Sequence, residues 1–586
     1  MLGGFKRMKR KIWLVLALVM VLSALVGCGG KPAPAPSGDA TSDQGKAPAP
    51  APANEEAGKT DGVLDVVHAS EPDSIDPALN TSVDGAIMLQ HAFEGLVKWV
   101  DDGNGTAKLA PGMAESWDVS EDGLEWTFHL RDGIKWSDGK PVTAADFKFS
   151  WDRLVDIKTA ADYEYMLDMV KGYNEIREED EKVGKKELKD EERTAKLAIE
   201  AVDEKTFKVT LNNRCPYFEE ICAFPATFPI REDMVKNEKW TFDPATYISN
   251  GPFKMKSWEH NSKITFVKNP EYYGAADITA ETIVFHLMDD ANAMLAGYRS
   301  GELDMITEVP QDEIPGLLSS GELKTKPYVG TYFVCFNTQK APFDDPKVRE
   351  AFSLAIDRNF IVSQVTGRGE VPAAGFVPAG VYDAKGSAGD DFRTVGGGFY
   401  SINDADYKAN CDKARELLKE AGYEDGKGFP VVEYLYNTND NHRAIGEALQ
   451  NMWQTELGVT VNLQNQDWAV FLQERKNGNF SIARHGWIAD YNDPMTFIDM
   501  WMTGGGNNDA QYKNPEFDNL LKDAKKEADP EKRMELLHKA ENLAIKEDKI
   551  VAPLYFYVNP YMIKPNVEGV YYTPLGYFFY GYTKGF

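Results

Sequence analysis

The pattern of apolar and polar positions begins with a short hydrophobic run. Lys6 to Lys11 form a positively charged segment, and Ile12 to Val26 are apolar apart from Ser23. A membrane-spanning helix needs about 20 apolar residues, and the stretch that follows this run is polar and rich in proline. The pattern therefore predicts a secretory signal peptide over residues 1–27 rather than a transmembrane helix.

The next segment contains no large apolar side chain that could start a core. It consists mostly of alanine, proline, glycine, serine and small polar residues, with the run KAPAPAP at 46–52. Such a composition predicts a disordered, partly polyproline II tether over residues 28–60 that holds a folded body away from a membrane surface.

Beyond residue 60, short segments rich in Val, Ile, Phe and Tyr alternate with helical patterns. The segments bounded by turn residues predict strands, which cover residues 63–69, 264–268, 283–287, 332–337, 431–436 and 459–463. Capping residues and N1 prolines predict helices that begin at Thr143 (a capping box with Asp146), Asp345-Pro346 and Asp529-Pro530. A terminal glycine, Gly422, predicts the end of a helix over 412–421. Dense mixed charge predicts an exposed helix over 175–196. The alternation predicts an α/β fold with mixed sheets.

Charge narrows the possible partners. The formal net charge is −28, and it becomes −33 when the signal peptide and its five basic residues are removed. Such an acidic chain is not expected to bind nucleic acid or to dock electrostatically on anionic lipid.

Four cysteines lie in the body: Cys215, Cys222, Cys335 and Cys411. They allow three full pairings among which the sequence does not choose. A chain of this length does not need disulfides to fold, so free buried thiols are the alternative. The spacing of Cys215 and Cys222 fits neither a metal knuckle nor a redox motif.

Motifs of enzyme chemistry are missing from the sequence. It has no G-x-S-x-G, no G-x-x-x-x-G-K-[ST] and no H-E-x-x-H, and its eight histidines are scattered. We therefore expect a protein that is not an enzyme and that uses no cofactor or metal. Aromatic residues with isolated polar neighbours, such as Trp468, Trp487 and Trp501, suit either a ligand pocket or core packing.

Several blocks along the body resemble one family. The longest, LAPGMAESWDVSEDGLEWTFHLRDGIKWSDGKPVTAADF at 109–147, resembles the signature of the solute-binding proteins that serve oligopeptide, dipeptide and nickel importers. Further matching blocks are EPDSIDP (71–77), FEGL (93–96), SNGPFK (249–254), YRSGELDM (298–305), FNTQKAPFDDPKVREAFSLAIDR (336–358) and ADYNDP (489–494). The resemblance covers 63–586, and its C-terminal blocks are closer to the oligopeptide branch than to the nickel branch.

The resemblance implies a periplasmic-binding-protein-like fold with two lobes, mixed sheets and an additional domain inserted in the first lobe. The expected boundaries are 61–328 for the first lobe, with the insert at roughly 84–210, then 329–557 for the second lobe and 558–586 for the return to the first. Such a protein captures short peptides between its lobes and delivers them to ABC permease subunits in the membrane, which are driven by a separate ATPase.

The resemblance also implies site residues. Asp490 matches the aspartate that pairs with the peptide ammonium, although the local sequence alone would suit a turn residue. Glu71 and Asp73 on one side, with Gly486 and Ile488 on the other, match main chains that hold the peptide backbone by strand addition. Matches to groups that receive the peptide C-terminus are Arg475, Arg484 and His442, and matches to side-chain pockets are Trp468, Trp487, Cys335 and Tyr163.

Some positions depart from the family pattern. Gly330 and Ile488 stand where enteric members carry a disulfide, so that bridge should be absent. Thr366 replaces a lysine that helps to receive the C-terminus of some peptides, with Arg368 close by. Cys335 replaces an acidic residue, and its loss could weaken a preference for basic side chains.

The end of the signal peptide, Leu25-Val26-Gly27-Cys28, resembles a bacterial lipobox. It implies lipidation of Cys28, which would anchor a monomeric protein to the outer face of the cytoplasmic membrane. The long tether suits a Gram-positive surface. Two alternatives remain: the same fold dedicated to a signalling peptide, a nickel chelate or a sugar, and a surface interaction or chaperone-like lipoprotein.

Overall fold

The computed structural model describes residues 62–68, 71–183 and 194–586. The predicted signal peptide, its lipidation site Cys28 and the tether over 28–60 lie outside these residues. Within the described ranges, no helix combines the length and the apolar character that crossing a membrane requires.

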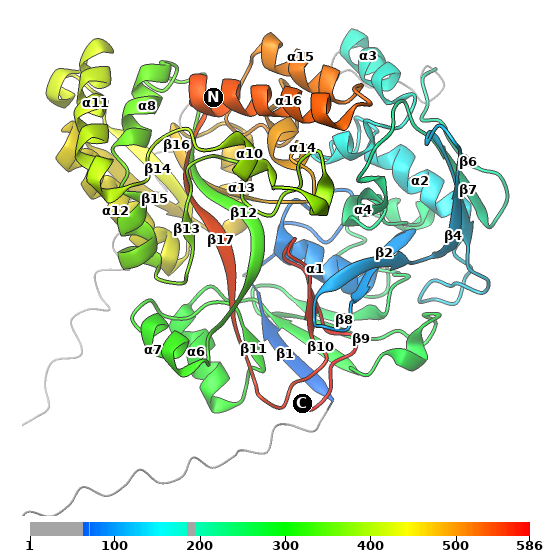
Figure 1. Cartoon of the computed structure of the whole chain (residues 1–586). Helices are drawn as coiled ribbons and strands as arrows, with labels where there is room; N and C mark the ends of the chain where they lie inside the picture. Colours follow the sequence, from blue (N-terminus) through cyan, green and yellow to red (C-terminus); the bar gives the residue numbers. More distant parts are fainter. Residues whose placement is uncertain (1–61, 69–70, 184–193) are drawn as a thin grey trace, which may run out of the picture. The chain divides into compact units, whose positions relative to one another are not determined.

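One continuous mixed sheet runs through the described chain, where it has 11 strands (Figure 1). Its order is β15 (Val461–Gln466), β14 (Val432–Asn437), β16 (Ile482–Ile488), β12 (Lys324–Phe336), β17 (Val551–Ile563), β11 (Met305–Ile306), β1 (Val63–Val67), β10 (Thr282–His286), β9 (Lys263–Lys268) and β8 (Phe253–Glu259), with β13 (Val371–Pro372) beside β17. Parallel pairs such as β1 with β10 occur beside antiparallel pairs such as β12 with β16. The predicted α/β fold with mixed sheets is therefore confirmed.

Two long strands join the two halves of this sheet. We call the half around β1, β8–β11 the first lobe and the half around β14–β16 the second lobe. β12 and β17 pair in both halves, with Lys324 opposite Tyr561 at one end and Cys335 opposite Val551 at the other. Their register shifts between Pro327 and Thr331, so the irregularity separates the first-lobe ladder from the second-lobe ladder.

The six predicted strands all overlap with strands of the structure, namely β1, β9, β10, β12, β14 and β15; the last prediction, 459–463, shares only residues 461–463 with β15. β12 begins at Lys324, well before the predicted start at 332, because its first residues pair with β17 in the first lobe. Residue 69, the predicted end of the first strand, lies outside the described residues.

Helices cover the second-lobe sheet on the face that carries Val432 and Tyr434. They include α8 (Pro346–Leu354), α11 (Tyr407–Glu420) and α12 (Asp440–Leu457). The predicted N-cap is confirmed, because the Asp345 carboxylate accepts a hydrogen bond from the Lys347 amide at 2.8 Å. Trp453 of α12 packs on Phe352 of α8 with ring centroids 5.1 Å apart.

An additional domain lies between β1 and β8 in the sequence. In the described residues it contains a four-stranded sheet in the order β4 (Ala114–Val119), β5 (Glu125–Leu130), β7 (Thr206–Thr210) and β6 (Ile199–Ala201), and a hairpin of β2 (Val97–Asp101) and β3 (Ala107–Pro111). Its helix α2 (Ala144–Leu154) starts at the predicted capping box, where the Thr143 amide donates to the Asp146 carboxylate at 2.8 Å. Trp151 of this helix packs edge-on against Phe207 of β7, which joins helix and sheet in one core.

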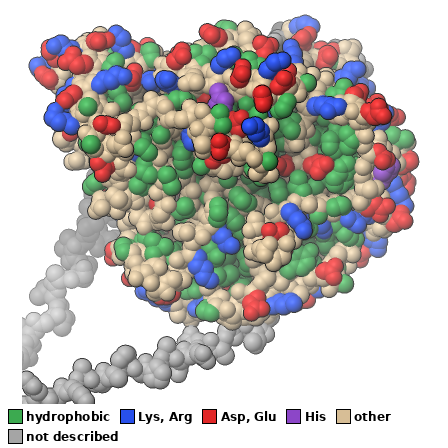
Figure 2. Space-filling view, viewed as in Figure 1, with side chains coloured by type: hydrophobic (Ala, Val, Ile, Leu, Met, Phe, Trp, Pro, Cys, Tyr) green, Lys and Arg blue, Asp and Glu red, His purple; other side chains and the backbone are tan. Residues whose placement is uncertain are grey.

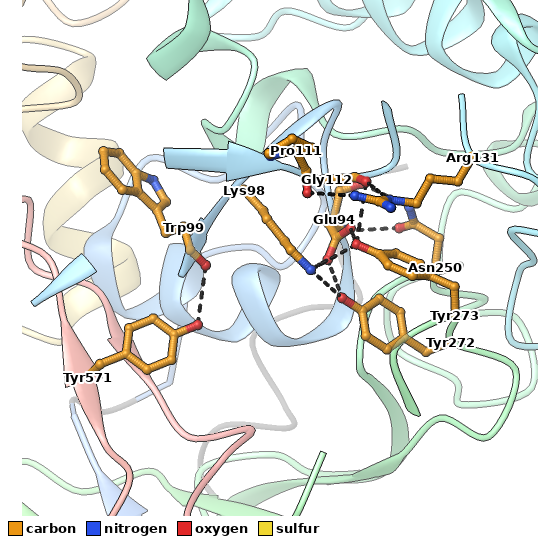
Figure 3. Close-up of polar contacts among 10 residues, drawn as sticks. All are labelled: Glu94, Lys98, Trp99, Pro111, Gly112, Arg131, Asn250, Tyr272, Tyr273 and Tyr571. Atoms are coloured by element: carbon orange, nitrogen blue, oxygen red, sulfur yellow. Dashed lines mark hydrogen bonds and ion pairs between the residues drawn. The ribbon is translucent and has the colours of Figure 1, made fainter. Parts of the chain in front are cut away.

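Polar contacts anchor this domain to the first lobe (Figure 3). The Glu94 carboxylate, just after α1 (Val83–Ala92), accepts hydrogen bonds from the hydroxyls of Tyr272 and, at 2.7 Å, Tyr273. The Lys98 ammonium donates to the Tyr273 hydroxyl at 2.8 Å and lies 3.4 Å from the Glu94 carboxylate. The Tyr571 hydroxyl near the C-terminus donates to the carbonyl of Trp99 at 3.2 Å. Every charge of this cluster has a partner within the protein.

The predicted exposed helix over 175–196 is only partly correct. Helix α3 covers Tyr173–Val183, residues 184–193 lie outside the described ones, and residues 194–196 are not helical. The amide of Ala195 donates to the Glu179 carboxylate at 3.1 Å, so the chain has turned back along the helix. Ile176 is buried, which a pattern of mixed charge alone does not reveal.

The remaining helices are α4 (Phe218–Ile221), α5 (Glu232–Val235), α6 (Ala291–Ser300), α7 (Ile314–Ser320), α9 (Arg358–Phe360), α10 (Phe392–Gly396), α13 (Trp468–Lys476), α14 (Met495–Ile498), α15 (Pro515–Ala524) and α16 (Pro530–Glu541), and β18 (Tyr571–Tyr572) pairs with β19 (Phe578–Phe579). The cysteines of the body, Cys215, Cys222, Cys335 and Cys411, are all free. Gly330 lies opposite Ile488 on adjacent strands, and no disulfide joins these two positions because neither residue is a cysteine.

Candidate functional site

A cavity of about 350 Å³ lies where the first lobe, the additional domain and the second lobe meet. Segments from all three line it: residues 80–84 and 86–87, 288–289, 307–308, 437–439 and 441–442, 484–490, 557–560 and 575–577, with single side chains from other elements. On the face shown in Figure 2, hydrophobic side chains gather toward the middle, and charged ones are denser along the upper edge. A cavity of this size that joins apolar walls to a few polar groups suits a small ligand.

Strand β16 carries the second-lobe wall of the cavity. It pairs with β12 along its whole length, but on its other side it pairs with β14 only at Ile482 and Ala483. Beyond that point, residues 484–488 have a ladder on one edge only. A Cβ at Gly486 would lie 2.2 Å from the Tyr557 hydroxyl, so a larger residue there would force the Tyr557 side chain to move.

Asp490 follows β16 and is 8% exposed. Its carboxylate accepts hydrogen bonds from the Tyr163 hydroxyl at 3.1 Å and the Thr496 hydroxyl at 3.3 Å. Among the described residues, no lysine, arginine or histidine forms an ion pair with it. Burial raises the pKa of Asp490 well above its usual value, and the nearby Asp499 carboxylate adds to this, while the two hydroxyls oppose it. A cation supplied by a ligand would stabilise the ionised form.

The three predicted basic groups all line the cavity but differ in their partners. The Arg475 guanidinium is paired with the Asp509 carboxylate at 2.5 Å. Burial, together with the charges of Arg484 and Arg368, lowers the pKa of His442 well below its usual value, so this imidazole is neutral.

Arg484 differs from these two groups, because no described Asp or Glu forms an ion pair with its guanidinium. Its guanidinium lies 5.4 Å from the Tyr332 ring and 5.7 Å from the Trp468 ring, and its Nε atom is buried without a hydrogen-bond partner in the described chain. The aromatic faces stabilise the cation, but they give its buried Nε–H group no acceptor. Arg368, which also lines the cavity, is already paired with Glu308 at 2.7 Å.

Three predicted aromatic residues lie in the cavity wall: Trp468, Trp487 and Tyr163. Tyr163 belongs to the additional domain, and its ring packs edge-on against Phe224 at 5.1 Å. The indole Nε1 atoms of both tryptophans are buried without a hydrogen-bond partner in the described residues. They are donors that a ligand carbonyl can satisfy.

Two first-lobe predictions differ from what the structure shows. Glu71 and Asp73 are not part of the cavity lining, which includes Asn80–Asp84 instead. The Glu71 carboxylate accepts hydrogen bonds from the Asn261 amide at 2.8 Å and pairs with His260. Asp73 accepts hydrogen bonds from Thr81 and Ser82, so it holds the lining segment from behind. The N-cap Ser82 ahead of α1 was the sequence signal that could have located this segment.

Cys335 is also absent from the lining. It lies fully buried within β12, where burial raises its pKa far above the usual thiol value. Its position in the ladder opposite Ala483 and Val551 keeps it inside the sheet. Thr366 likewise lies outside this cavity and donates to Glu370 at 2.9 Å.

Contacts across the cavity join the additional domain to the second lobe. Lys476 pairs with Asp162 at 2.5 Å, and the Asn507 amide donates to the Tyr165 hydroxyl at 3.1 Å. Tyr217 stacks on Tyr491 with centroids 4.1 Å apart. The two sides therefore touch around the cavity and partly enclose it.

Comparison with known proteins gives a consistent picture. Residues 108–509, more than half of the chain, match the bacterial extracellular solute-binding proteins, family 5. The chain is 37% identical over 524 residues to the oligopeptide-binding protein OppA of Bacillus subtilis, which covers 88% of this chain and 91% of that protein. The structure of Haemophilus influenzae OppA in complex with RPPGFSPFR aligns with a TM-score of 0.81 at 31% identity, covering 90% of this chain and 99% of that one.

Two solved structures of one relative align with this chain to very different extents. The Escherichia coli murein tripeptide binding protein MppA aligns with a TM-score of 0.79 at 32% identity, covering 88% of this chain and 97% of that one. Its unliganded open form aligns at only 0.55, with 31% identity over 90% of this chain and 96% of that one. The lobes described here are thus arranged unlike those of the open form. The fold, the cavity between lobes and the matching sequence agree: the chain belongs to the bacterial extracellular solute-binding proteins, family 5, and has their two-lobe α/β fold.

Proposed function

We propose that this protein is the substrate-binding component of an ABC importer and captures short peptides between its lobes. The observation that carries the proposal is the pair of uncompensated charges in one cavity, the carboxylate of Asp490 and the guanidinium of Arg484. A free peptide is a zwitterion, so its ammonium and its carboxylate can supply the two missing partners. The relatives named for oligopeptides support this ligand class.

The peptide backbone would be held by strand addition. Residues 484–488 of β16 present an edge without a neighbouring strand, and this edge includes Gly486 and Ile488. Main-chain hydrogen bonds at such an edge bind any sequence, while alternate side chains enter pockets. On the first-lobe side we propose the segment Asn80–Asp84 in place of Glu71 and Asp73.

We assign the peptide carboxylate to Arg484, since Arg475 is paired and His442 is neutral. Trp468, Trp487 and Tyr163 would form the side-chain walls. The first lobe would comprise 61–328, with the insert at roughly 84–210, and the return segment 558–586, and the second lobe 329–557. A peptide that touches both lobes stabilises the closed form through contacts that the open form lacks.

The test is to identify what co-purifies with the protein. All described residues belong to a unit that begins at residue 57, so removing the first 28 residues leaves that unit whole. Denaturing mass spectrometry should release a series of assorted short peptides from it. Asp490→Ala should reduce their amount strongly, whereas Asp523→Ala, at an exposed position on α15, should not. A single non-peptide species in the unaltered protein would contradict the proposal.

The membrane arrangement is a separate part of the proposal. Lipidation of Cys28 would hold a monomeric binding protein at the outer face of the cytoplasmic membrane, where it passes peptides to a permease powered by a separate ATPase. Metabolic labelling with a palmitate analogue should mark the full chain, and Cys28→Ala should abolish the label. As the protein would not be an enzyme, bound peptides should be recovered intact after prolonged incubation.

A further inference from the structure

We propose that Asp84 forms a second acidic subsite, which selects a lysine or arginine side chain of the bound peptide. This inference rests on the proposed peptide binding and narrows it to a substrate class. It uses a residue that the sequence patterns did not single out.

Asp84 is placed at the cavity by the first turn of α1. The N-cap Ser82 accepts a hydrogen bond from the Gly85 amide, which fixes the start of the helix, and Asp84 lies between them. The side chain lines the cavity, yet Asp84 is only 9% exposed. Its Oδ2 atom is buried and has no hydrogen-bond partner among the described residues, and no ion pair with it is formed there either.

Acidic residues are common in the first turn of a helix, but that preference does not account for a carboxylate that is buried without a counter-charge among the described residues, as Asp84 is. Carboxylates in a first helical turn interact favourably with the helix dipole while they remain in water, as the exposed Glu516 does in α15. Burial of a carboxylate without a counter-charge opposes that gain. Burial, with help from the nearby Asp73 carboxylate, raises the pKa of Asp84 to about 7, and the Ser82 hydroxyl only partly offsets this.

The other end of the same helix shows the usual solution. Glu94 is buried too, but Tyr272, Tyr273 and Lys98 satisfy its carboxylate (Figure 3). The small cavity beside that cluster, about 40 Å³, has no such open charge to offer a ligand. The two ends of α1 therefore differ in whether the protein itself supplies the partner.

Asp84 shares the cavity with the groups that we assign to the two ends of the peptide. Asp84, Asp490 and Arg484 all line it, so a peptide bound through Asp490 and Arg484 can present one of its side chains to Asp84. The experiment below therefore varies the position of the cationic residue along the peptide.

The chemistry of the subsite fits a long cationic side chain. Val83, Ala86 and Ile87 line the cavity beside Asp84 and offer apolar surface. A lysine or arginine can lay its methylene groups on such surface and present its charge to the carboxylate. The sequence suggested that the loss of an acid at Cys335 could weaken a preference for basic side chains. Cys335 does not line the cavity, and Asp84 supplies a carboxylate there from another element.

The experiment measures peptide affinity by calorimetry on protein lacking its first 28 residues and freed of ligand by unfolding and refolding. The probes are alanine tetrapeptides with one lysine at position 1, 2 or 3, each compared with the norleucine peptide, which has a similar length and no charge. At one position the lysine peptide should bind about 10- to 100-fold tighter than its norleucine partner. Asp84→Asn should reduce that ratio to about threefold or less, and the control Glu516→Gln should preserve it.

The outcomes separate this inference from the proposed function. If the tetrapeptides bind and Asp490→Ala weakens them, but no position favours lysine, the acidic subsite is wrong and peptide binding stands. A lysine preference that survives Asp84→Asn also overturns the assignment to Asp84. If none of the peptides binds, the proposed function fails, and the inference fails with it. The comparison of lysine with norleucine in the unaltered protein needs no variant, so it decides the preference even where a variant does not fold.

Discussion

Asp490 and Asp493 lie three residues apart in one loop, and both are buried, with 8% and 5% of their surface exposed. Their surroundings are opposite. The Arg533 guanidinium binds Asp493 through two parallel hydrogen bonds of 2.7 and 2.8 Å, and the Met495 amide adds a third at 3.0 Å. Among the described residues, the Asp490 carboxylate accepts hydrogen bonds from only two groups, the hydroxyls of Tyr163 and Thr496.

The same contrast separates the cavity wall from the framework, by which we mean buried residues that do not line the cavity. In the framework, Glu541 accepts two hydrogen bonds from Arg393 and two more from main-chain amides. In the wall, Asp490 and Asp84 lack any such cation among the described residues. An unpaired buried carboxylate lowers the stability of the free protein, and a functional site is the place where that disadvantage is retained. The four predictions below test this contrast, from the largest expected effect to the smallest.

Arg533→Met should destabilise the protein most. It leaves the Asp493 carboxylate buried without its cation, which we expect to lower the free energy of unfolding by about 3–5 kcal/mol. Urea unfolding measures it. The neighbouring Lys532→Met breaks only the exposed pair with Asp529 at 3.6 Å, and it should lower the free energy of unfolding far less because solvent screens that pair. Equal effects from both variants would remove the distinction between framework and surface charges.

Asp490→Asn should act mainly on ligand affinity. The ammonium of a bound peptide would then be buried without its counter-charge, which weakens binding by about 2–4 kcal/mol, or roughly 30- to 1,000-fold in Kd. Calorimetry with trialanine on ligand-free protein gives the number. An unchanged Kd would mean that the ammonium lies elsewhere in the cavity.

The same variant should stabilise the ligand-free protein, in contrast to Arg533→Met. Burial raises the pKa of Asp490 in the folded state above its unfolded value of 3.8, so the folded state binds the proton more tightly. The penalty is therefore absent below the unfolded pKa and grows as pH rises toward the raised pKa. Asp490→Asn removes it, with an expected gain of about 0.5–2 kcal/mol at pH 8 and a smaller one at pH 5. A gain that shrinks as pH rises would contradict this assignment.

Lys476→Ala should have the smallest effect. Its ion pair with Asp162 joins the two sides of the cavity, but 38% of the lysine side chain is exposed. Solvent screening limits such a pair to about 0.2–1 kcal/mol, so peptide Kd should rise less than about fivefold. Lys522→Ala, at an exposed position on α15, is the control that should leave Kd unchanged. A larger loss in Lys476→Ala would mean that closure depends on this pair.

The sequence predicted helix starts correctly where the capping hydrogen bonds join residues that are close along the chain. The capping of α2 by Thr143 and Asp146 and of α8 by Asp345 involves hydrogen bonds that span only two or three residues, so the pattern of residue types predicts them. The helix over 175–196 was predicted too long, because its end depends on the return of Ala195 to Glu179 across a longer stretch.

The candidate site was predicted in part, through the resemblance to a family. That resemblance singled out Asp490 and Arg484, which the structure brings into one cavity. It also pointed to Glu71, Asp73 and Cys335, which the structure places outside the cavity lining. Short sequence blocks identify a segment of the chain but not which of its residues face a cavity, because that choice depends on how several segments pack together.

By itself, the sequence determined the family, the alternation of strands and helices, the acidic surface and the expectation of secretion, since each of these follows from composition or from neighbours along the chain. Only the tertiary structure decided which buried charges have partners. Tyr163 reaches Asp490 across 327 positions, and Arg393 reaches Glu541 across 148. A charge is paired or left open by atoms a few ångströms away in space, and folding alone brings those atoms together.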